Sequence, residues 1–238
     1  MSKHSGQPPS HLTASVPKVF SSIKARGSHP SNLWFFDSPK NGKRFTFTSD
    51  VAFMHFVLLE GDFAVSGYLP EPPPVRTLID GEIRETRLDA HIYLVDGHVD
   101  WFEFKREQDS GPSRKGRSRP QLSAQAQAAA EAGARYVVRT DKDLIGKDVL
   151  FDNWLTICAN INRCKKFSIY LEAEAIAKIA SSKSAFTFGE LHRFPNIDTA
   201  LMNAAIGTAL QRGVISCDLN TEFLSPGTTF VRGPNGSR

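Results

Sequence analysis

The chain has 238 residues, of which 40% are hydrophobic and 23% are charged, which is ordinary for a folded protein with a sizeable core. No apolar run approaches the roughly 20 residues that cross a bilayer, and the N-terminus lacks the apolar core of an export signal. We therefore expect a cytoplasmic protein without a membrane partner. The three cysteines and seven histidines show neither paired spacing nor an H-E-x-x-H motif, which argues against a zinc site.

The N-terminal elements are predicted from composition and alternation. Residues 1–31 are rich in Ser, Pro, Lys and His without lasting periodicity, which predicts a flexible arm. Residues 44–48 alternate as a strand does. Either Ser49 or Asp50 is a suitable N-cap for the helix that follows, and Gly61 is a suitable end for it.

A β-hairpin is predicted in the middle of the chain. Residues 87–95 and 99–105 both read as strands, and the Asp96-Gly97 dipeptide between them is a strong hairpin turn. A helix, a strand and a second helix are then expected at residues 121–132, 135–139 and 151–161. This order predicts an α/β fold, a mixed sheet flanked by helices, over residues 32–180.

The C-terminal part, residues 181–238, has a different character. A short helix is expected to begin at residues 188–191, and an amphipathic helix is expected at 199–212. Residues 214–219 and 228–231 could pair as a small β-wing. These elements predict a small winged-helix-like domain.

Three residues of the hairpin indicate a catalytic site that binds a metal ion. Asp89 lies on the first strand, and Glu103 and Lys105 share one face of the second because strand side chains alternate. Two carboxylates suit Mg²⁺, which prefers oxygen ligands, and a lysine beside them can orient a water or neutralise developing charge. The alternative is that these are surface charges on an exposed hairpin face, since the D-x(n)-E-x-K pattern is loose.

Basic residues crowd the segment after the hairpin. The cluster consists of Lys105, Arg106, Arg114, Lys115, Arg117 and Arg119. Beside a nuclease site, the four residues from Arg114 to Arg119 would contact DNA phosphates. The alternative is an ordinary solvated loop.

The hairpin resembles the nuclease core of TnsA-type transposon endonucleases, which belong to the PD-(D/E)xK superfamily. The resemblance is carried by Arg87-Leu88-Asp89, the Asp96-Gly97 turn and Glu103-Phe104-Lys105. It extends over about residues 33 to 231, including Leu58–Val65, Ala132–Thr140 and Gly213–Leu219. No single motif is specific, but their order is.

The resemblance implies a restriction-endonuclease-like fold and cutting of one DNA strand at each transposon end, in the bacterial nucleoid. It implies Mg²⁺ as the cofactor, for which Mn²⁺ may substitute, with Asp89 and Glu103 as metal ligands and Lys105 as a catalytic residue. A DDE-type transposase and an AAA+ regulator are the implied partners. Related nucleases place a polar residue of the next helix near the scissile phosphate, and Gln125 is our candidate; a glutamine on the helix surface is the alternative.

One position departs from the family. A glutamate is usual in the first helix where this chain has Ala52. Either Asp89 and Glu103 suffice, or Asp50 substitutes, or the protein is a catalytically impaired subunit that binds DNA and partners; an engineered alanine is a further explanation. Glu60 shares the helical face of Ala52 but lies about 12 Å further along.

Overall fold

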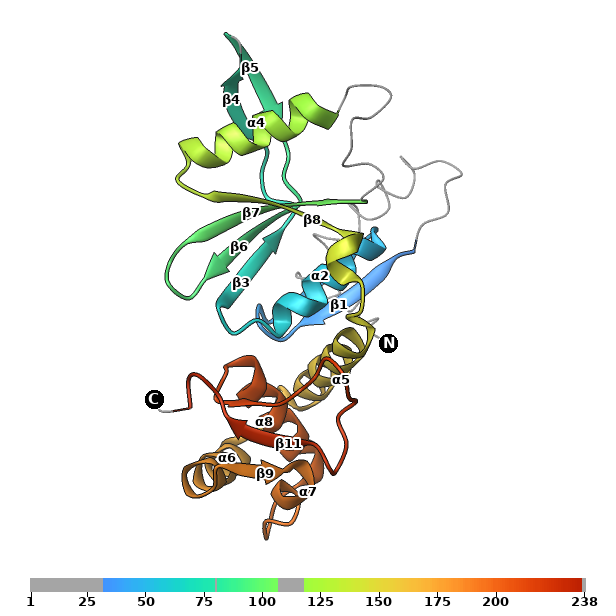
Figure 1. Ribbon diagram of the computed structural model, residues 1–238, viewed down its shortest axis with the longest axis vertical. Helices are drawn as coiled ribbons and strands as arrows, with labels where there is room; N and C mark the ends of the chain where they lie inside the picture. Colours follow the sequence, from blue (N-terminus) through green and yellow to red (C-terminus); the bar gives the residue numbers. More distant parts are fainter. Residues whose placement is uncertain (1–31, 80, 107–117, 237–238) are drawn as a thin grey trace, which may run out of the picture.

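The computed structural model describes residues 32–79, 81–106 and 118–236. It shows a mixed sheet with helices in one half and a mainly helical second half (Figure 1). The arm predicted at residues 1–31 lies outside the described residues. Within the described part of the chain, no helix is long and apolar enough to cross a membrane.

The central sheet has four strands in the order β3-β6-β7-β8. Its strands are β3 (Val65–Pro70), β6 (Ala90–Leu94), β7 (Val99–Lys105) and β8 (Arg135–Thr140). β6 pairs antiparallel with both β3 and β7, while β7 and β8 are parallel. Helix α4 (Ser118–Glu131) makes the crossover that a parallel pair requires. The predicted α/β class with a mixed sheet is confirmed.

The predicted hairpin is formed by β6 and β7. His91 faces Trp101 across the pair, and Gly97 has a φ of 88° in the turn, a conformation that glycine adopts without a steric penalty. The first strand is shorter than predicted, because β6 begins at Ala90 and Asp89 lies just before it.

Two helices cover opposite faces of β7 (Figure 1). The ring of Phe104 lies 5.3 Å from that of Phe56, which belongs to α2 (Asp50–Glu60). The neighbouring Glu103 points the other way and contacts Gln125 of α4. Because side chains alternate along a strand, β7 presents the aromatic rings of Phe102 and Phe104 to α2. Its other face carries Glu103 and Lys105 beside Trp101, which is buried in an apolar cluster with two alanines of α4.

Helix α2 is held by a second hairpin, β1 (Trp34–Ser38) and β2 (Lys43–Phe47). Rings stack between them, Trp34 on Phe53 with centroids 4.4 Å apart and Phe47 on Phe56 at 4.6 Å. Ser49 is the N-cap, since its side chain accepts from the N–H of Ala52.

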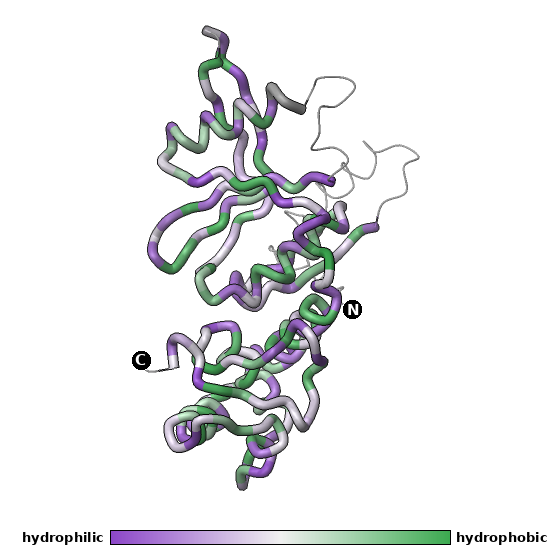
Figure 2. The backbone as a smooth tube through the Cα atoms, in the orientation of Figure 1, coloured by the Kyte–Doolittle hydropathy of each residue, from purple (hydrophilic) through white to green (hydrophobic). Residues whose placement is uncertain are grey.

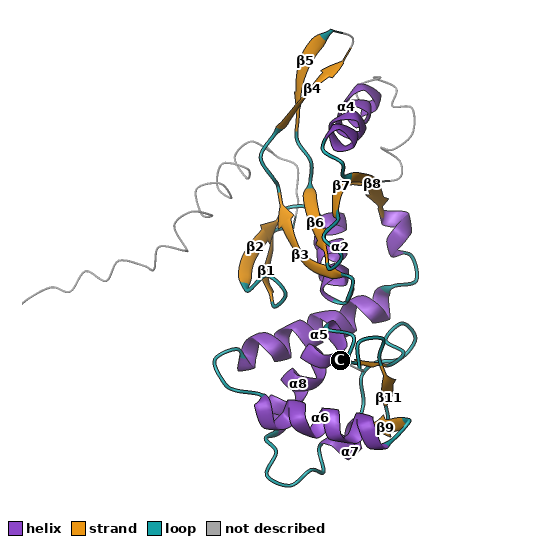
Figure 3. Cartoon of the chain, turned by 90° about the vertical axis from the view of Figure 1, so that its left-hand side faces the viewer, coloured by secondary structure: helices purple, strands orange, loops and turns teal. Residues whose placement is uncertain are grey.

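A third hairpin, β4 (Val75–Ile79) and β5 (Glu82–Thr86), projects beyond the sheet beside α4 (Figure 3). Thr77 donates to Glu131, and Gln127 donates to the carbonyl of Leu78 at 2.7 Å. The hairpin is thereby fixed to α4. This hairpin has no counterpart among the predicted elements, the first of whose middle strands was expected at residues 87–95.

The second half contains most of the remaining elements. They are α5 (Asp148–Cys164), α6 (Tyr170–Ser182), β9 (Ala185–Thr187), α7 (Phe188–Leu191), α8 (Thr199–Gln211), β10 (Ile215–Ser216) and β11 (Thr229–Arg232), with the 3-10 helix η1 (Asp141–Leu144) before them. The three strands pair in the order β10-β11-β9. The predicted pairing of the last two strands is confirmed by the register of Ile215 with Arg232. Helix α6 has no counterpart among the predicted elements.

Helix α8 is buried between α5 and α6. A Cβ on Gly207 would lie 2.9 Å from Ile157 of α5, so glycine permits the close approach of these helices. Figure 2 shows hydrophobic stretches along the central strands and along α5 and α8. One continuous core includes Phe56 of the first half and Ile206 of the second, and the division at residues 180 and 181 stays a prediction.

Candidate active site

Asp89 lies where the first strand of the hairpin separates from the second. Its backbone N–H donates to the carbonyl of Phe102 at 3.1 Å. Its carboxylate then accepts, through Oδ2, a 2.7 Å hydrogen bond from the N–H of Phe104. The Asp89 side chain thus accepts the hydrogen bond that the carbonyl of a neighbouring strand would otherwise accept from Phe104. This bond to the backbone of β7 fixes the Asp89 carboxylate beside Glu103.

Glu103 and Lys105 lie on the face of β7 that is turned toward α4. Glu103 is 3% exposed, and Lys105 Nζ lies 2.6 Å from its Oε1. Its other oxygen, Oε2, accepts a 2.7 Å hydrogen bond from Nε2 of Gln125. The alternative that these are charges on an exposed hairpin face is wrong for Glu103, which is buried beneath α4.

The electrostatics of Asp89 reflect this crowding. Burial raises its pKa to about 6, and the negative charge of Glu103 adds to the rise, while the Phe104 N–H and Lys105 oppose it. Two carboxylates are therefore held close together in a poorly solvated place. A cation beside them would remove the penalty on their joint ionisation.

The donors present fit a hard divalent ion. Asp89 Oδ1 accepts no hydrogen bond from the described residues, and each oxygen of Glu103 keeps a second lone pair beside the one that it already shares. Within residues 32–79, 81–106 and 118–236, no group of three or more His, Cys, Asp or Glu side chains could hold a metal. Asp89 and Glu103 would thus supply two ligands, and water and substrate oxygens the others, as is common for Mg²⁺.

The acids of helix α2 are engaged elsewhere. Asp50 Oδ1 accepts hydrogen bonds from Asn32 at 3.0 Å and from Trp34 at 2.8 Å. Glu60 is completely buried at the other end of the helix. Ala52 is half-buried against the core, on a helix that packs on the aromatic face of β7. No carboxylate of α2 is hydrogen-bonded to Asp89 or Glu103 in the described structure.

The predicted basic segment is only partly described. Arg114, Lys115 and Arg117 lie outside the described residues. Arg119 belongs to the first turn of α4, which begins three residues earlier than expected. In the sequence, the segment connects Lys105 to the helix that carries Gln125.

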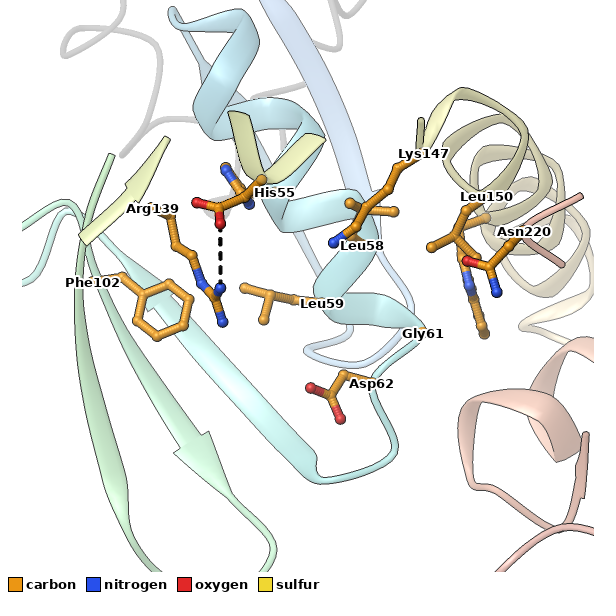
Figure 4. A pocket seen from close by; sticks show the side chains of 12 residues that line it. His55, Leu58, Leu59, Gly61, Asp62, Phe102, Arg139, Lys147, Leu150 and Asn220 are labelled. Carbon is orange, nitrogen blue, oxygen red and sulfur yellow. Dashed lines mark ion pairs between the residues drawn. The ribbon is translucent and has the colours of Figure 1, made fainter. Parts of the chain in front are cut away.

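A cavity of about 320 Å³ lies on the other face of the sheet. Figure 4 shows that His55 of α2, Phe102 of β7 and Arg139 of β8 line it, together with Lys147. Phe102 has the same orientation along β7 as Phe104, opposite to that of Glu103. The strand therefore separates this cavity from the candidate active site.

Tyr136 is a member of the site that the sequence did not single out. Its hydroxyl donates to Oε1 of Gln125 at 2.7 Å. Burial raises the pKa of Tyr136, and the charges of Glu103 and Asp89 raise it further. The strand pattern of residues 135–139 predicted its secondary structure only. Gln125 itself is fully buried, so the alternative of a surface glutamine is wrong.

Comparison with known proteins adds no relative. No model of a protein family matches this chain, and no curated protein matches it in sequence.

Proposed function

We propose that this protein is a Mg²⁺-dependent DNA endonuclease of the PD-(D/E)xK class that cuts one strand at transposon ends. The observation that carries the proposal is the convergence of Asp89, Glu103 and Lys105 on one side of β7, with a buried carboxylate 2.6 Å from the lysine. Glu103 is a charged group that is only 3% exposed, and such a group is costly to bury. Such groups are common at functional sites.

The order of elements supports the finer fold assignments. A helix, three antiparallel strands, a crossover helix and a parallel strand are what we expect of a restriction-endonuclease-like core. Likewise α6, β9, α7, α8, β10 and β11 follow the order expected of a winged-helix-like domain. Its α8 carries no basic residue and is buried against α5 and α6. We therefore assign this half to contacts with the DDE-type transposase and the AAA+ regulator, and not to reading bases through α8.

The side chains divide the chemistry between them. Asp89 and Glu103 would hold the ion, and a bound Mg²⁺ would polarise the scissile phosphate. Lys105 is one-fifth exposed, at 22%, so its ammonium can reach a substrate oxygen while Glu103 orients it. There it would position the attacking water or neutralise charge that develops on the phosphate. The basic residues Arg114, Lys115, Arg117 and Arg119 would contact the DNA backbone.

Nicking of transposon-end DNA tests the proposal. The protein is mixed with Mg²⁺ or Mn²⁺, with and without the transposase subunit, and strand cleavage is measured. Asp89→Ala, Glu103→Gln and Lys105→Met should each lower the rate by about a thousandfold or more while circular dichroism stays unchanged. Glu174→Gln, a change of an exposed carboxylate on α6, is the matched control. Full nicking by Asp89→Ala would refute the assignment.

The second candidate is a catalytically impaired subunit that binds DNA and partners. Ala52 in place of the expected helix glutamate favours it, together with a site that offers two carboxylates in place of three. The same assay separates the two functions. DNA binding with no metal-dependent nicking, even with the transposase present, would favour the impaired subunit.

A further inference from the structure

The amide of Gln125 has a complete set of buried partners. Its two N–H groups donate to Glu103 Oε2 at 2.7 Å and to the carbonyl of Arg87 at 2.6 Å. Its Oε1 accepts from the hydroxyl of Tyr136 at 2.7 Å. Gln125 is 0% exposed. Both N–H groups are used within the protein, so none is left to donate to a phosphate of the substrate.

The two acceptors of this amide belong to the two segments that carry the carboxylates. Arg87 precedes Asp89 by two residues, and Glu103 lies on the neighbouring strand. A single planar group therefore spans both segments and limits how far they can separate. If the amide were flipped, its oxygen would face two acceptors, so this orientation alone satisfies all three partners.

Tyr136 provides the third anchor. It lies on β8, in register with Trp101 of β7, and its hydroxyl binds the amide oxygen, while the amide nitrogen binds Glu103. Without its hydroxyl, Oε1 of Gln125 would be buried and unpaired. A buried acceptor without a partner is costly, so the amide would lose its fixed place.

We propose that Tyr136 and Gln125 are positioning residues that set the separation and orientation of Asp89 and Glu103. This inference rests on the proposed function for its catalytic consequence, but its structural part can be measured without cleavage. The substrate is not touched by either residue. Their effect is transmitted through the Glu103 carboxylate and through the backbone at Arg87.

Hydrogen exchange of the Gln125 side-chain amide tests the structural part. In the wild-type protein, NMR should show slow exchange for both amide protons, since each is buried and bonded. Tyr136→Phe removes only the hydroxyl and should accelerate that exchange about tenfold or more. Tyr93→Phe, on β6 of the same sheet with a side chain 39% exposed, is the control and should leave the exchange unchanged. Unchanged exchange in Tyr136→Phe would overturn the proposal.

A double-mutant cycle on nicking tests the catalytic part. Tyr136→Phe should lower the rate about tenfold, and Gln125→Met, which keeps the side-chain length, should lower it at least as much. Because Tyr136 acts through Gln125, adding Tyr136→Phe to Gln125→Met should have no further effect. If the two substitutions lowered the nicking rate additively, Tyr136 would not act through Gln125, and the proposal would be overturned. If the wild-type protein does not nick DNA while the exchange behaves as expected, the proposed function fails and the positioning network stands.

Discussion

Glu60 and the Asp89–Glu103 pair place carboxylates beside the same sheet, and the two sites are built differently. Glu60 accepts hydrogen bonds from Ser38 Oγ, the Lys40 backbone N–H, the Tyr68 hydroxyl and Gln211 Nε2. Glu60 thereby connects α2, the β1–β2 hairpin and β3 to the end of α8. Among the described residues, the Asp89 carboxylate accepts one hydrogen bond, from a backbone N–H, and the charge with the largest effect on its pKa is another carboxylate, Glu103.

The difference separates a structural acid, Glu60, from the acid to which our proposal assigns a function, Asp89. A buried carboxylate with four donors is compensated by the protein itself and has no need of a ligand. Asp89 is compensated incompletely, and this deficit is seen in its pKa, which burial and the charge of Glu103 raise to about 6. The deficit is what a divalent cation would remove. Counting donors thus distinguishes two sites that residue type and burial alone would treat as equal.

Glu60→Gln should have the largest effect on stability. The substitution keeps the shape but replaces an acceptor oxygen by a donor, and it removes the negative charge beside the buried Lys40. Burial lowers the pKa of Lys40 to about 8, and Glu60 opposes that fall. We expect a loss of roughly 3 kcal/mol in the free energy of unfolding. Thermal unfolding followed by circular dichroism measures it.

Glu174→Gln serves again as the control, since that carboxylate is exposed on α6, and should change stability by less than about 0.5 kcal/mol. Equal stability of Glu60→Gln and the wild type would remove the structural role assigned to Glu60. The comparison with the Asp89 site would then lose its basis.

Asp89→Asn should have the opposite effect at neutral pH, because it should increase the stability of the folded protein. The pKa of Asp89 in the folded protein, about 6, lies above the ordinary value of 3.8, so the stability associated with its protonated form is lost as pH rises through 6. An asparagine cannot ionise and avoids that loss. The variant should be more stable than the wild type by about 2 kcal/mol at pH 7.5 and equal to it below about pH 4.

Unfolding curves measured from pH 4 to pH 8 test this expectation. A stability difference that does not depend on pH would show that Asp89 is not the strained group of the site. Glu60→Gln provides the contrast, because it should remain destabilised at pH 7.5.

The local elements were predictable because their causes are local. The Asp96-Gly97 turn and the alternation of residues 99–105 placed Glu103 and Lys105 on one face of one strand. That prediction is confirmed. Asp89 was expected within the strand, and it lies just before β6 because the chain leaves the sheet there.

The partners of these residues were not predictable, since they come from distant parts of the chain. Gln125 meets Glu103 only because α4 crosses back over β7, and Tyr136 joins them from the following strand. The sequence placed Glu60 on the helical face of Ala52, and its side chain is completely buried. Its donor Gln211, however, lies 151 residues further on, and no local pattern indicates it.

Binding of Mn²⁺, measured by calorimetry at pH 7.5 without DNA, tests the central claim most directly. Wild type, Asp89→Asn, Glu103→Gln and Glu60→Gln are compared. The two-carboxylate site predicts that the wild type binds Mn²⁺, that Asp89→Asn and Glu103→Gln each weaken binding at least about tenfold, and that Glu60→Gln leaves it unchanged. Equal Mn²⁺ affinity of the wild type, Asp89→Asn and Glu103→Gln would contradict it.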